Sequence, residues 1–324
     1  MRCRGRCSTV RRRSALVSGV ALAALMALVI GPVVTPVAPA AASTPVYPVG
    51  GLATAVSNFV FSPDAVAGAN NWSCRPSAAH PYPVVLVPAT FVNEGTNWVA
   101  LSPMLADAGY CVYSFNYGMT ALSLGRVGGL GDIAASAQTM AAFVNQVLAA
   151  TGAAQVDVVG HSQGGMMPNY YLKYLGGAPK VHAFVGLAPS NHGTTVDGIV
   201  TLGSDLGVLG FANNLLLTLG SPGLTEQEAG SSFQQHLFAG GDTVPGPAYV
   251  VIETQHDEVV TPYTNAFLSG PNVTNIDIQH QCPADPVGHI GMFTDGPALQ
   301  DVMNALGADS PTFEPSCSNY GLPL

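Results

Sequence analysis

The chain has 324 residues, of which 48% are hydrophobic and only 9% are charged, with a formal net charge of −9 at pH 7. Few charges and many apolar residues are typical of a compact folded protein. The acidic balance argues against nucleic acid as a partner, because phosphate backbones would be repelled, and it disfavours electrostatic adsorption to anionic lipid.

The N-terminal segment predicts a secretory signal peptide. Six arginines precede an apolar run from Ala15 to Ile30, and the small residues of 40–43 follow it. A basic start, an apolar centre and small residues at the cleavage position characterise such signals. The alternative is a membrane anchor, but the run is shorter than the roughly 20 apolar residues that a span needs. We therefore expect residues 1–42 to be removed and the protein to be secreted without a stable anchor, and Arg12-Arg13 leave a twin-arginine route open.

Removal of this segment changes the charge and cysteine content. Four basic residues then remain against nineteen acidic ones, a net charge of −15 with histidine neutral. The remaining cysteines are Cys74, Cys111, Cys282 and Cys317. An even number in an oxidising compartment favours two disulfides, with three pairings possible, of which neighbouring pairs close the shorter loops. No spacing typical of a zinc site occurs, so we expect no metal.

Residues 43–324 are expected to form a single α/β domain, because apolar strand-like runs alternate with helical patterns. The expected strands are 83–88, 110–116, 155–160, 180–188, 249–253 and 273–278, and the expected helices are 97–108 (capped by Asn97), 132–150, 163–175 and 291–306. Apolar runs without polar alternation suit strands that are covered on both faces. The alternation predicts a mainly parallel sheet with helices on both sides.

One long segment, about 191–247, contains no strand-like run. Its leucines recur at roughly helical spacing, and it is too apolar to be disordered. Long inserts in compact domains are usually functional. We interpret it as a set of short helices that cap a pocket, with an ordinary space-filling excursion as the alternative.

The strongest motif is Gly160-His161-Ser162-Gln163-Gly164, which lies between an apolar strand and a helical pattern. A serine at such a strand-to-helix turn has a strained backbone and an exposed hydroxyl. Side chains at either glycine would collide across the turn. The following helix directs its amides at a developing anion. The motif therefore predicts Ser162 as a nucleophile, against a chance match in a glycine-rich chain.

A serine nucleophile needs a base and an acid, which follow it along the chain in the order acid, then histidine. Of the eight histidines, His280 and His289 fit this order, and His289 lies in a glycine-flanked loop after the last strand. We predict His289 as the base. Asp257 follows the strand after the insert and is the predicted acid, with Glu258 as the runner-up. Asp285 is expected to cap a loop.

Two donors are expected to stabilise the anion formed on the substrate. The backbone N–H of Gln163 directly follows the nucleophile. The loop after the first core strand offers Thr90, through its backbone N–H and its hydroxyl. The alternative for Thr90 is a turn residue that bonds its own backbone.

Together these stretches resemble the secreted class 2 lipases and esterases of actinobacteria, with a looser likeness to Candida antarctica lipase B. The resemblance is carried by PVVLVPATF, GHSQGGMMP, HDEVVTP and GHIGMF. It implies the α/β-hydrolase fold, a Thr90 that donates through both groups, and Asp257 as the acid. It also implies the disulfides Cys74–Cys111 and Cys282–Cys317. The position before the serine is a tryptophan in Candida antarctica lipase B and is His161 here. We expect this difference to leave the role of Ser162 unchanged.

The sequence thus predicts a secreted, monomeric serine esterase or lipase that acts on lipid or other acyl esters through Ser162, His289 and Asp257. No cofactor is required by this chemistry. An acyltransferase or a polyester depolymerase would use the same residues. A binding module that has lost catalysis is the alternative from another class.

Overall fold

The computed structural model describes residues 46–208 and 221–324. The expected signal peptide and part of the apolar insert lie outside the described residues. Residues 44–324 fall into one compact unit.

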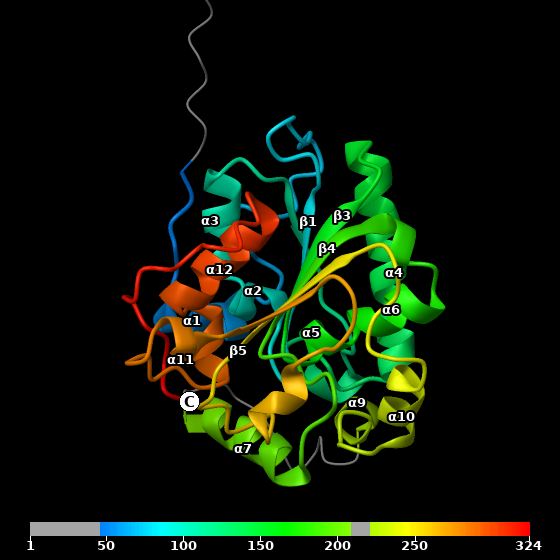
Figure 1. The fold of residues 1–324 in the computed structure, drawn as a ribbon, viewed down its shortest axis with the longest axis vertical. Coiled ribbons are helices and arrows are strands. Elements are labelled where there is room, and N and C mark those ends of the chain that lie inside the picture. Colours follow the sequence, from blue (N-terminus) through cyan, green and yellow to red (C-terminus); the bar gives the residue numbers. More distant parts are fainter. Residues whose placement is uncertain (1–45, 209–220) are drawn as a thin grey trace, which may run out of the picture. The chain divides into compact units, whose positions relative to one another are not determined.

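The centre of this unit is a six-stranded sheet in which every neighbouring pair of strands is parallel (Figure 1). The strands follow in the spatial order β2-β1-β3-β4-β5-β6. Their bounds are β1 Val84–Val87, β2 Val112–Ser114, β3 Val156–His161, β4 Val181–Leu187, β5 Ala248–Glu253 and β6 Val273–Asp277. All six expected strands are present, and β1 and β3 are buried along their whole length because helices cover both faces.

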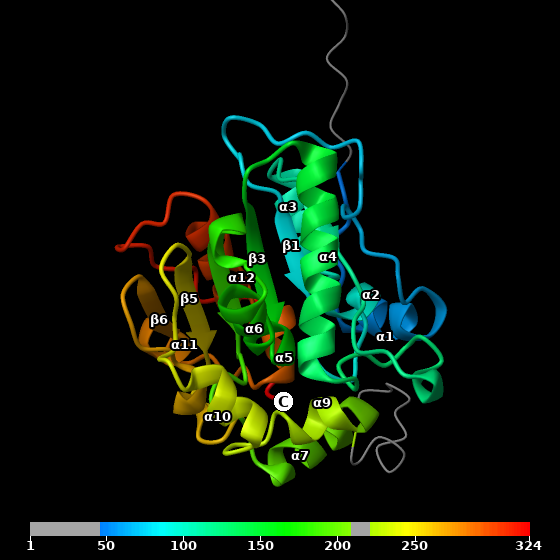
Figure 2. The ribbon, with the colours of Figure 1, turned by 90° about the vertical axis from the view of Figure 1, so that its right-hand side faces the viewer.

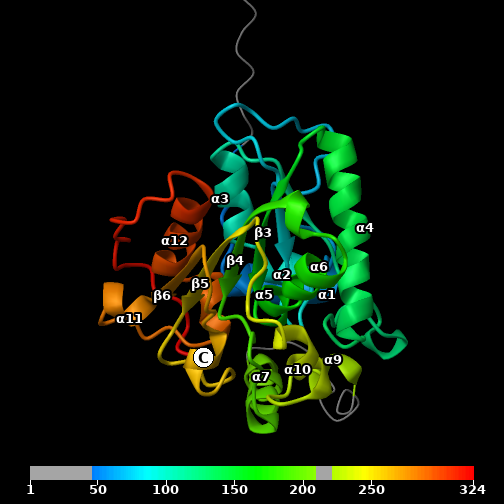
Figure 3. The ribbon, with the colours of Figure 1, turned by 45° about the vertical axis from the view of Figure 1, so that its right-hand side comes forward.

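Helices pack on the two faces of the sheet, α3 and α12 on one and α4 and α6 on the other (Figures 1 and 3). The helical segments around the sheet are α1 Leu52–Phe61, α2 Glu94–Asn97, α3 Leu101–Asp107, α4 Ile133–Thr151, α5 Gln163–Met166, α6 Pro168–Tyr174, α11 Ile278–Gln281 and α12 Gly296–Leu306. Because side chains alternate along a strand, Val158 belongs to the apolar cluster that contains Met140 of α4, while Val159 belongs to the one that contains Leu299 of α12. This arrangement confirms the expected fold class.

Helix α4 has the clearest end signals in the fold. Asp132 caps it by accepting a 2.7 Å hydrogen bond from the N–H of Ala135, and Gly152 ends it with a positive φ of 74°. By length and hydropathy, α4 is the one helix in the described part of the chain that could cross a membrane. Its buried face, which includes Met140 and Val144, packs on the sheet, so its apolar character belongs to the core.

Three expected helices, 97–108, 163–175 and 291–306, are interrupted in the structure, and each contains a proline near the point of interruption. The helix expected at 97–108 is two helices, α2 and α3, and Asn93 rather than Asn97 caps the first by accepting from the N–H of Thr96. Pro103 lies near the start of α3, where its ring would clash with a helical carbonyl four residues earlier, so the helix has to begin anew. The expected helix 163–175 is divided before Pro168, and 291–306 consists of the 3₁₀ turn η4 Ile290–Phe293 followed by α12.

The insert is helical where the structure describes it, with α7 Val196–Val208, α9 Pro222–Thr225 and α10 Ser232–Phe238. These helices lie beyond the carboxyl ends of the strands (Figure 2). Leu202 and Leu206 of α7 and Leu224 of α9 share an apolar cluster with Phe91 and Phe293. The insert is therefore packed against the edge at which the predicted site residues lie.

Of the two lysines of the chain, Lys180 lies at the opposite edge of the sheet, whereas Lys173 reaches the end of α10 in the insert. Lys173 is in the last turn of α6, and its Nζ donates 2.7 Å hydrogen bonds to the carbonyls of Leu237 and Gly241. Lys180 directly precedes β4 and donates to Asn145 Oδ1 at 2.7 Å.

Candidate active site

Ser162 lies in a sharp turn between β3 and α5. Its φ of 56° and ψ of −121° fall in a region that non-glycine residues rarely adopt. A Cβ added at Gly160 would lie 1.8 Å from the carbonyl oxygen of Gly164, and one at Gly164 would lie 2.2 Å from that of Val87. Glycine at both positions is therefore what allows this turn to form beside β1.

The structure brings Ser162, His289 and Asp257 into one continuous hydrogen-bonded chain. His289 Nε2 lies 2.9 Å from Ser162 Oγ, and His289 Nδ1 lies 2.7 Å from Asp257 Oδ2. The serine follows β3, the aspartate follows β5 and the histidine lies in the loop after β6. All three residues are buried. Such an arrangement can move a proton from the hydroxyl to the imidazole while the carboxylate holds the ring.

The electrostatics of the site raise the pKa of His289. Burial by itself would lower the pKa of the imidazole, but the charge and hydrogen bond of Asp257, with a smaller contribution from the Glu258 charge, raise it above its ordinary value. Asp257 is itself held by backbone N–H donors from Val259 at 2.8 Å and Val260 at 2.6 Å, both to Oδ1. The carboxylate is thereby oriented with Oδ2 toward the ring.

The runner-up residues occupy other positions. Glu258 is partly buried, and its Oε2 accepts a 3.4 Å hydrogen bond from the backbone N–H of His289 rather than from the ring. His280 is exposed on α11 and lies 3.8 Å from Asp277. Asp285 accepts from the N–H of Val287 at 3.0 Å, as expected of a loop-capping residue.

His161 has a contact that the sequence did not indicate. Its ring is fully buried next to the ring of His289, and its Nε2 donates to the backbone carbonyl of His289 at 3.1 Å. Burial, with the nearby charge of His289, lowers the pKa of His161 to about 3, so it is neutral. The residue before the nucleophile thus connects the turn directly to the histidine loop.

Thr90 and Gln163 lie where two donors can converge. Within the described segments, neither backbone N–H is engaged in a hydrogen bond. The Gln163 side chain donates to the carbonyls of Gly129 at 3.0 Å and Gly223 at 3.1 Å, which fixes the start of α5. Thr90 does not bond its own backbone: its Oγ1 accepts a 3.2 Å hydrogen bond from Gln227 Nε2, and its hydroxyl donates a longer bond of 3.4 Å to Gln227 Oε1. Donation to a reaction anion therefore requires the hydroxyl hydrogen to turn away from Gln227.

Gln227 supports the site although no pattern in the sequence indicates it. It lies between α9 and α10, is 4% exposed, and its Oε1 also accepts a 3.2 Å hydrogen bond from the Ser190 hydroxyl. A glutamine in a leucine-rich insert carries no motif, and only the fold shows that the insert supports the Thr90 loop.

A narrow apolar pocket adjoins the site. Its cavity volume is about 20 Å³, and it is lined by residues of the Thr90 loop, α2, η4 and α7: Ala89, Thr90, Val92, Thr96, Asn97, His161, Leu202, Leu206, Ile290 and Phe293. A cavity of this size holds about one water molecule.

The loop of His289 is fastened to the C-terminal segment. The backbone N–H groups of Gly288 and Gly291 donate to the carbonyls of Leu322 at 2.9 Å and Leu324 at 3.0 Å. A Cβ at Gly288 would lie 2.6 Å from the Leu324 backbone, so the two segments approach too closely for a side chain there. The glycines around the histidine therefore allow the C-terminal segment to lie directly against this loop.

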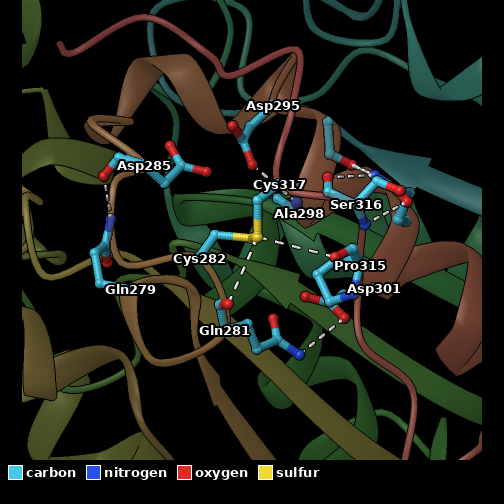
Figure 4. The surroundings of a disulfide bond; sticks show 12 residues. Gln279, Gln281, Cys282, Asp285, Asp295, Ala298, Asp301, Pro315, Ser316 and Cys317 are labelled. Atoms are coloured by element: carbon cyan, nitrogen blue, oxygen red, sulfur yellow. Dashed lines mark hydrogen bonds between the residues drawn. A yellow bond between two sulfur atoms is a disulfide. The ribbon is translucent and has the colours of Figure 1, made fainter.

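The disulfide Cys282–Cys317 fixes the start of this segment, with its sulfurs 2.06 Å apart (Figure 4). Nearby, Asp295 caps α12 through the N–H of Ala298 and also accepts from Gly321, both at 2.8 Å. The second disulfide joins Cys74 to Cys111, just before β2. Both pairings implied by the resemblance are present. No cluster of three potential metal-ligating side chains occurs among residues 46–208 and 221–324.

The family model described as lipase (class 2) matches residues 81–300. The chain is also similar to triacylglycerol lipases of Pseudarthrobacter phenanthrenivorans and Burkholderia plantarii, each 36% identical over 98 residues, or 29% of this chain. These matches span 28% and 25% of the respective relatives, about a quarter of their length.

Two solved structures share the fold. Lipase B of Aspergillus fumigatus has a TM-score of 0.57 at 23% identity, covering 77% of this chain and 57% of its own. Mature Bacillus licheniformis lipase BlEst2 has a TM-score of 0.52 at 17% identity, covering 72% of this chain and 94% of its own. With the parallel sheet described above, they show that the chain has the α/β-hydrolase fold.

The first prediction separates the two neighbouring acids. Asp257→Asn should lower kcat by roughly 10⁴-fold, because the ring loses the anion that orients it. Since the Asp257 charge raises the pKa of His289, its loss should also move the acidic limb of residual activity to lower pH. Glu258→Gln should retain most activity. Equal losses of kcat in the two variants would contradict the assignment.

The second prediction concerns the Thr90 hydroxyl. Thr90→Val keeps the backbone N–H and the shape of the side chain but removes one donor. Loss of one donor to the reaction anion costs on the order of 10²–10³ in kcat, with KM little changed. Steady-state kinetics on a short-chain ester measure this, and a valine variant within about threefold of the parent, under ~1 kcal/mol, would exclude the hydroxyl.

The third prediction compares the two disulfides. Replacing either pair by serines should cost ~2–5 kcal/mol of stability. The Cys282/Cys317 variant should also lose kcat, because the segment that holds the His289 loop is released, while the Cys74/Cys111 variant serves as the control. Melting temperatures and kcat at a temperature where both are folded give the comparison. Unchanged kcat in both would show that the bridge near the histidine serves stability alone.

Proposed function

The chain belongs to the class 2 lipase family, and we propose that it is a carboxylic-ester hydrolase whose nucleophile is Ser162. The observation that supports this most is the hydrogen-bonded chain from Ser162 Oγ through His289 to Asp257. A serine in a strained turn with a buried imidazole at 2.9 Å is suited to nucleophilic attack on a carbonyl.

The proposed reaction has two halves. His289 takes the proton of Ser162 as the oxygen attacks the ester carbonyl, and Asp257 stabilises the imidazolium. The tetrahedral anion accepts from the backbone N–H of Gln163 and from Thr90. His289 then protonates the leaving alcohol, and the acyl-enzyme is cleaved by a water molecule whose proton passes to the same imidazole.

The substrates that we propose are uncharged acyl esters, including acylglycerols. The relatives named triacylglycerol lipase and the apolar pocket beside the nucleophile support this class. The sequence beyond the expected signal peptide carries four basic residues against nineteen acidic ones, which would disfavour anionic substrates.

We also propose that residues 1–42 direct export and that residues 43–324 form the secreted catalytic domain, with 191–247 as its cap. The basic and apolar N-terminal pattern and the two disulfides support this, since structural disulfides persist in oxidising compartments.

The fourth prediction tests the nucleophile. Ser162→Ala should lose hydrolysis of p-nitrophenyl esters by roughly 10⁴-fold or more while the melting temperature is kept, because only one oxygen is removed. His289→Ala should be nearly as inactive, and His280→Ala is the matched control that stays active. A fluorophosphonate should label the parent and not Ser162→Ala. Hydrolysis by purified Ser162→Ala would refute the proposal.

The fifth prediction tests the pocket. Leu206→Ala removes apolar bulk from the pocket wall, so the ratio of kcat/KM for long against short acyl esters should rise about tenfold. Val200→Ala, on the exposed face of the same helix, is the control. If both variants keep the chain-length profile of the parent, the pocket does not bind the acyl chain.

A further inference from the structure

Glu253 is a buried carboxyl group that the proposed mechanism does not yet use. It ends β5, four residues before Asp257, and its exposed fraction is 0%. Its Oε1 accepts a 2.8 Å hydrogen bond from the N–H of Thr254, while Oε2 is buried without a hydrogen-bond donor. No ion pair involves Glu253 in the described ranges.

The titratable groups that face Glu253 are also acids. Asp257 lies within hydrogen-bonding reach of its side chain, and Asp277 is its partner in the register of β5 and β6. Burial, followed by the charges of these two carboxylates, raises the pKa of Glu253 well above its ordinary value. Two adjacent buried carboxyl groups do not both ionise, because their like charges repel each other where little water screens them.

The pattern of donors decides which group carries the charge. Asp257 accepts from the N–H groups of Val259 and Val260 and from His289 Nδ1. Asp277 accepts from Gln279 and Gln255. Glu253 accepts from one donor only. The better-solvated Asp257 is therefore the anion, and the free oxygen of Glu253 is the atom that carries a proton.

We propose that Glu253 is a neutral carboxylic acid whose Oε2–H donates a hydrogen bond to the Asp257 carboxylate, and that it is a positioning residue for His289. The proposal rests on the proposed function of the Ser162–His289–Asp257 chain. An additional donor to Asp257 weakens the interaction of that carboxylate with the imidazole and limits how far it raises the pKa of His289. The other groups facing the imidazole are Glu258 and the neutral His161.

Glu253→Gln provides the sharpest test, because the amide keeps an acceptor for Thr254 and a donor for Asp257 without adding or removing charge. The titration midpoint of His289, followed by ¹⁵N NMR of the imidazole, should stay within about 0.3 unit of the parent. If Glu253 were ionised in the parent, its removal would lower the midpoint by about 1 unit, which would overturn the proposal. Glu258→Gln is the matched control: it removes a carboxylate whose charge raises the pKa of His289, so its midpoint should fall.

Glu253→Met removes the donor altogether. The midpoint of His289 and the acidic limb of kcat/KM should then move to higher pH by about half a unit, with kcat about tenfold lower. A lower melting temperature with unchanged midpoint and kcat would show a structural role only and refute the proposal. The NMR readout does not need turnover, so a parent that hydrolyses no ester would contradict the proposed function while leaving the Glu253 test intact.

Discussion

The close approach of backbone segments at Gly160 and Gly164 is the constraint on which the site depends. Because no side chain separates β3 from α5 or from the end of β1, Ser162 can adopt its strained conformation at the centre of the sheet. The strands on one side of β3 then present Asp257 and the His289 loop, and β1 on the other side presents Thr90. A single tight turn thus places the nucleophile where elements from both halves of the sheet converge.

Features with a local chemical pattern were predictable from the sequence. The buried strands, the glycine-flanked serine and the order of Asp257 and His289 leave patterns within a few residues, and the structure brings these groups together. Pro103, near the break before α3, is also visible in the sequence, but the expected helix 97–108 ran through it. Gln227 and Glu253 were not predictable, because their importance comes from contacts with segments that follow no local spacing.

The histidine loop illustrates how several weak constraints fix one reactive side chain. The Asp257 carboxylate holds the ring, the carbonyl of His289 accepts from His161, and the backbone at Gly288 and Gly291 is bonded to the C-terminal segment. Each contact restrains a different part of the loop, so little rotational freedom is left to lose when the imidazole takes up a proton. The position of His289 is thus fixed by contacts with segments on both sides of its loop, and not by a regular helix or strand.

The placement of the two lysines has a practical consequence for attachment to solid supports. Lys180 directly precedes β4, at the edge of the sheet away from Ser162, and Lys173 is the only other lysine in the sequence. Amine-reactive coupling through Lys180 would therefore tether the protein by that edge and leave the mouth of the pocket facing the bulk liquid. Lys173 competes for the reagent only where it can be reached, because its ammonium group donates to two backbone carbonyls while burial lowers its pKa to about 8 and so favours the neutral, reactive amine.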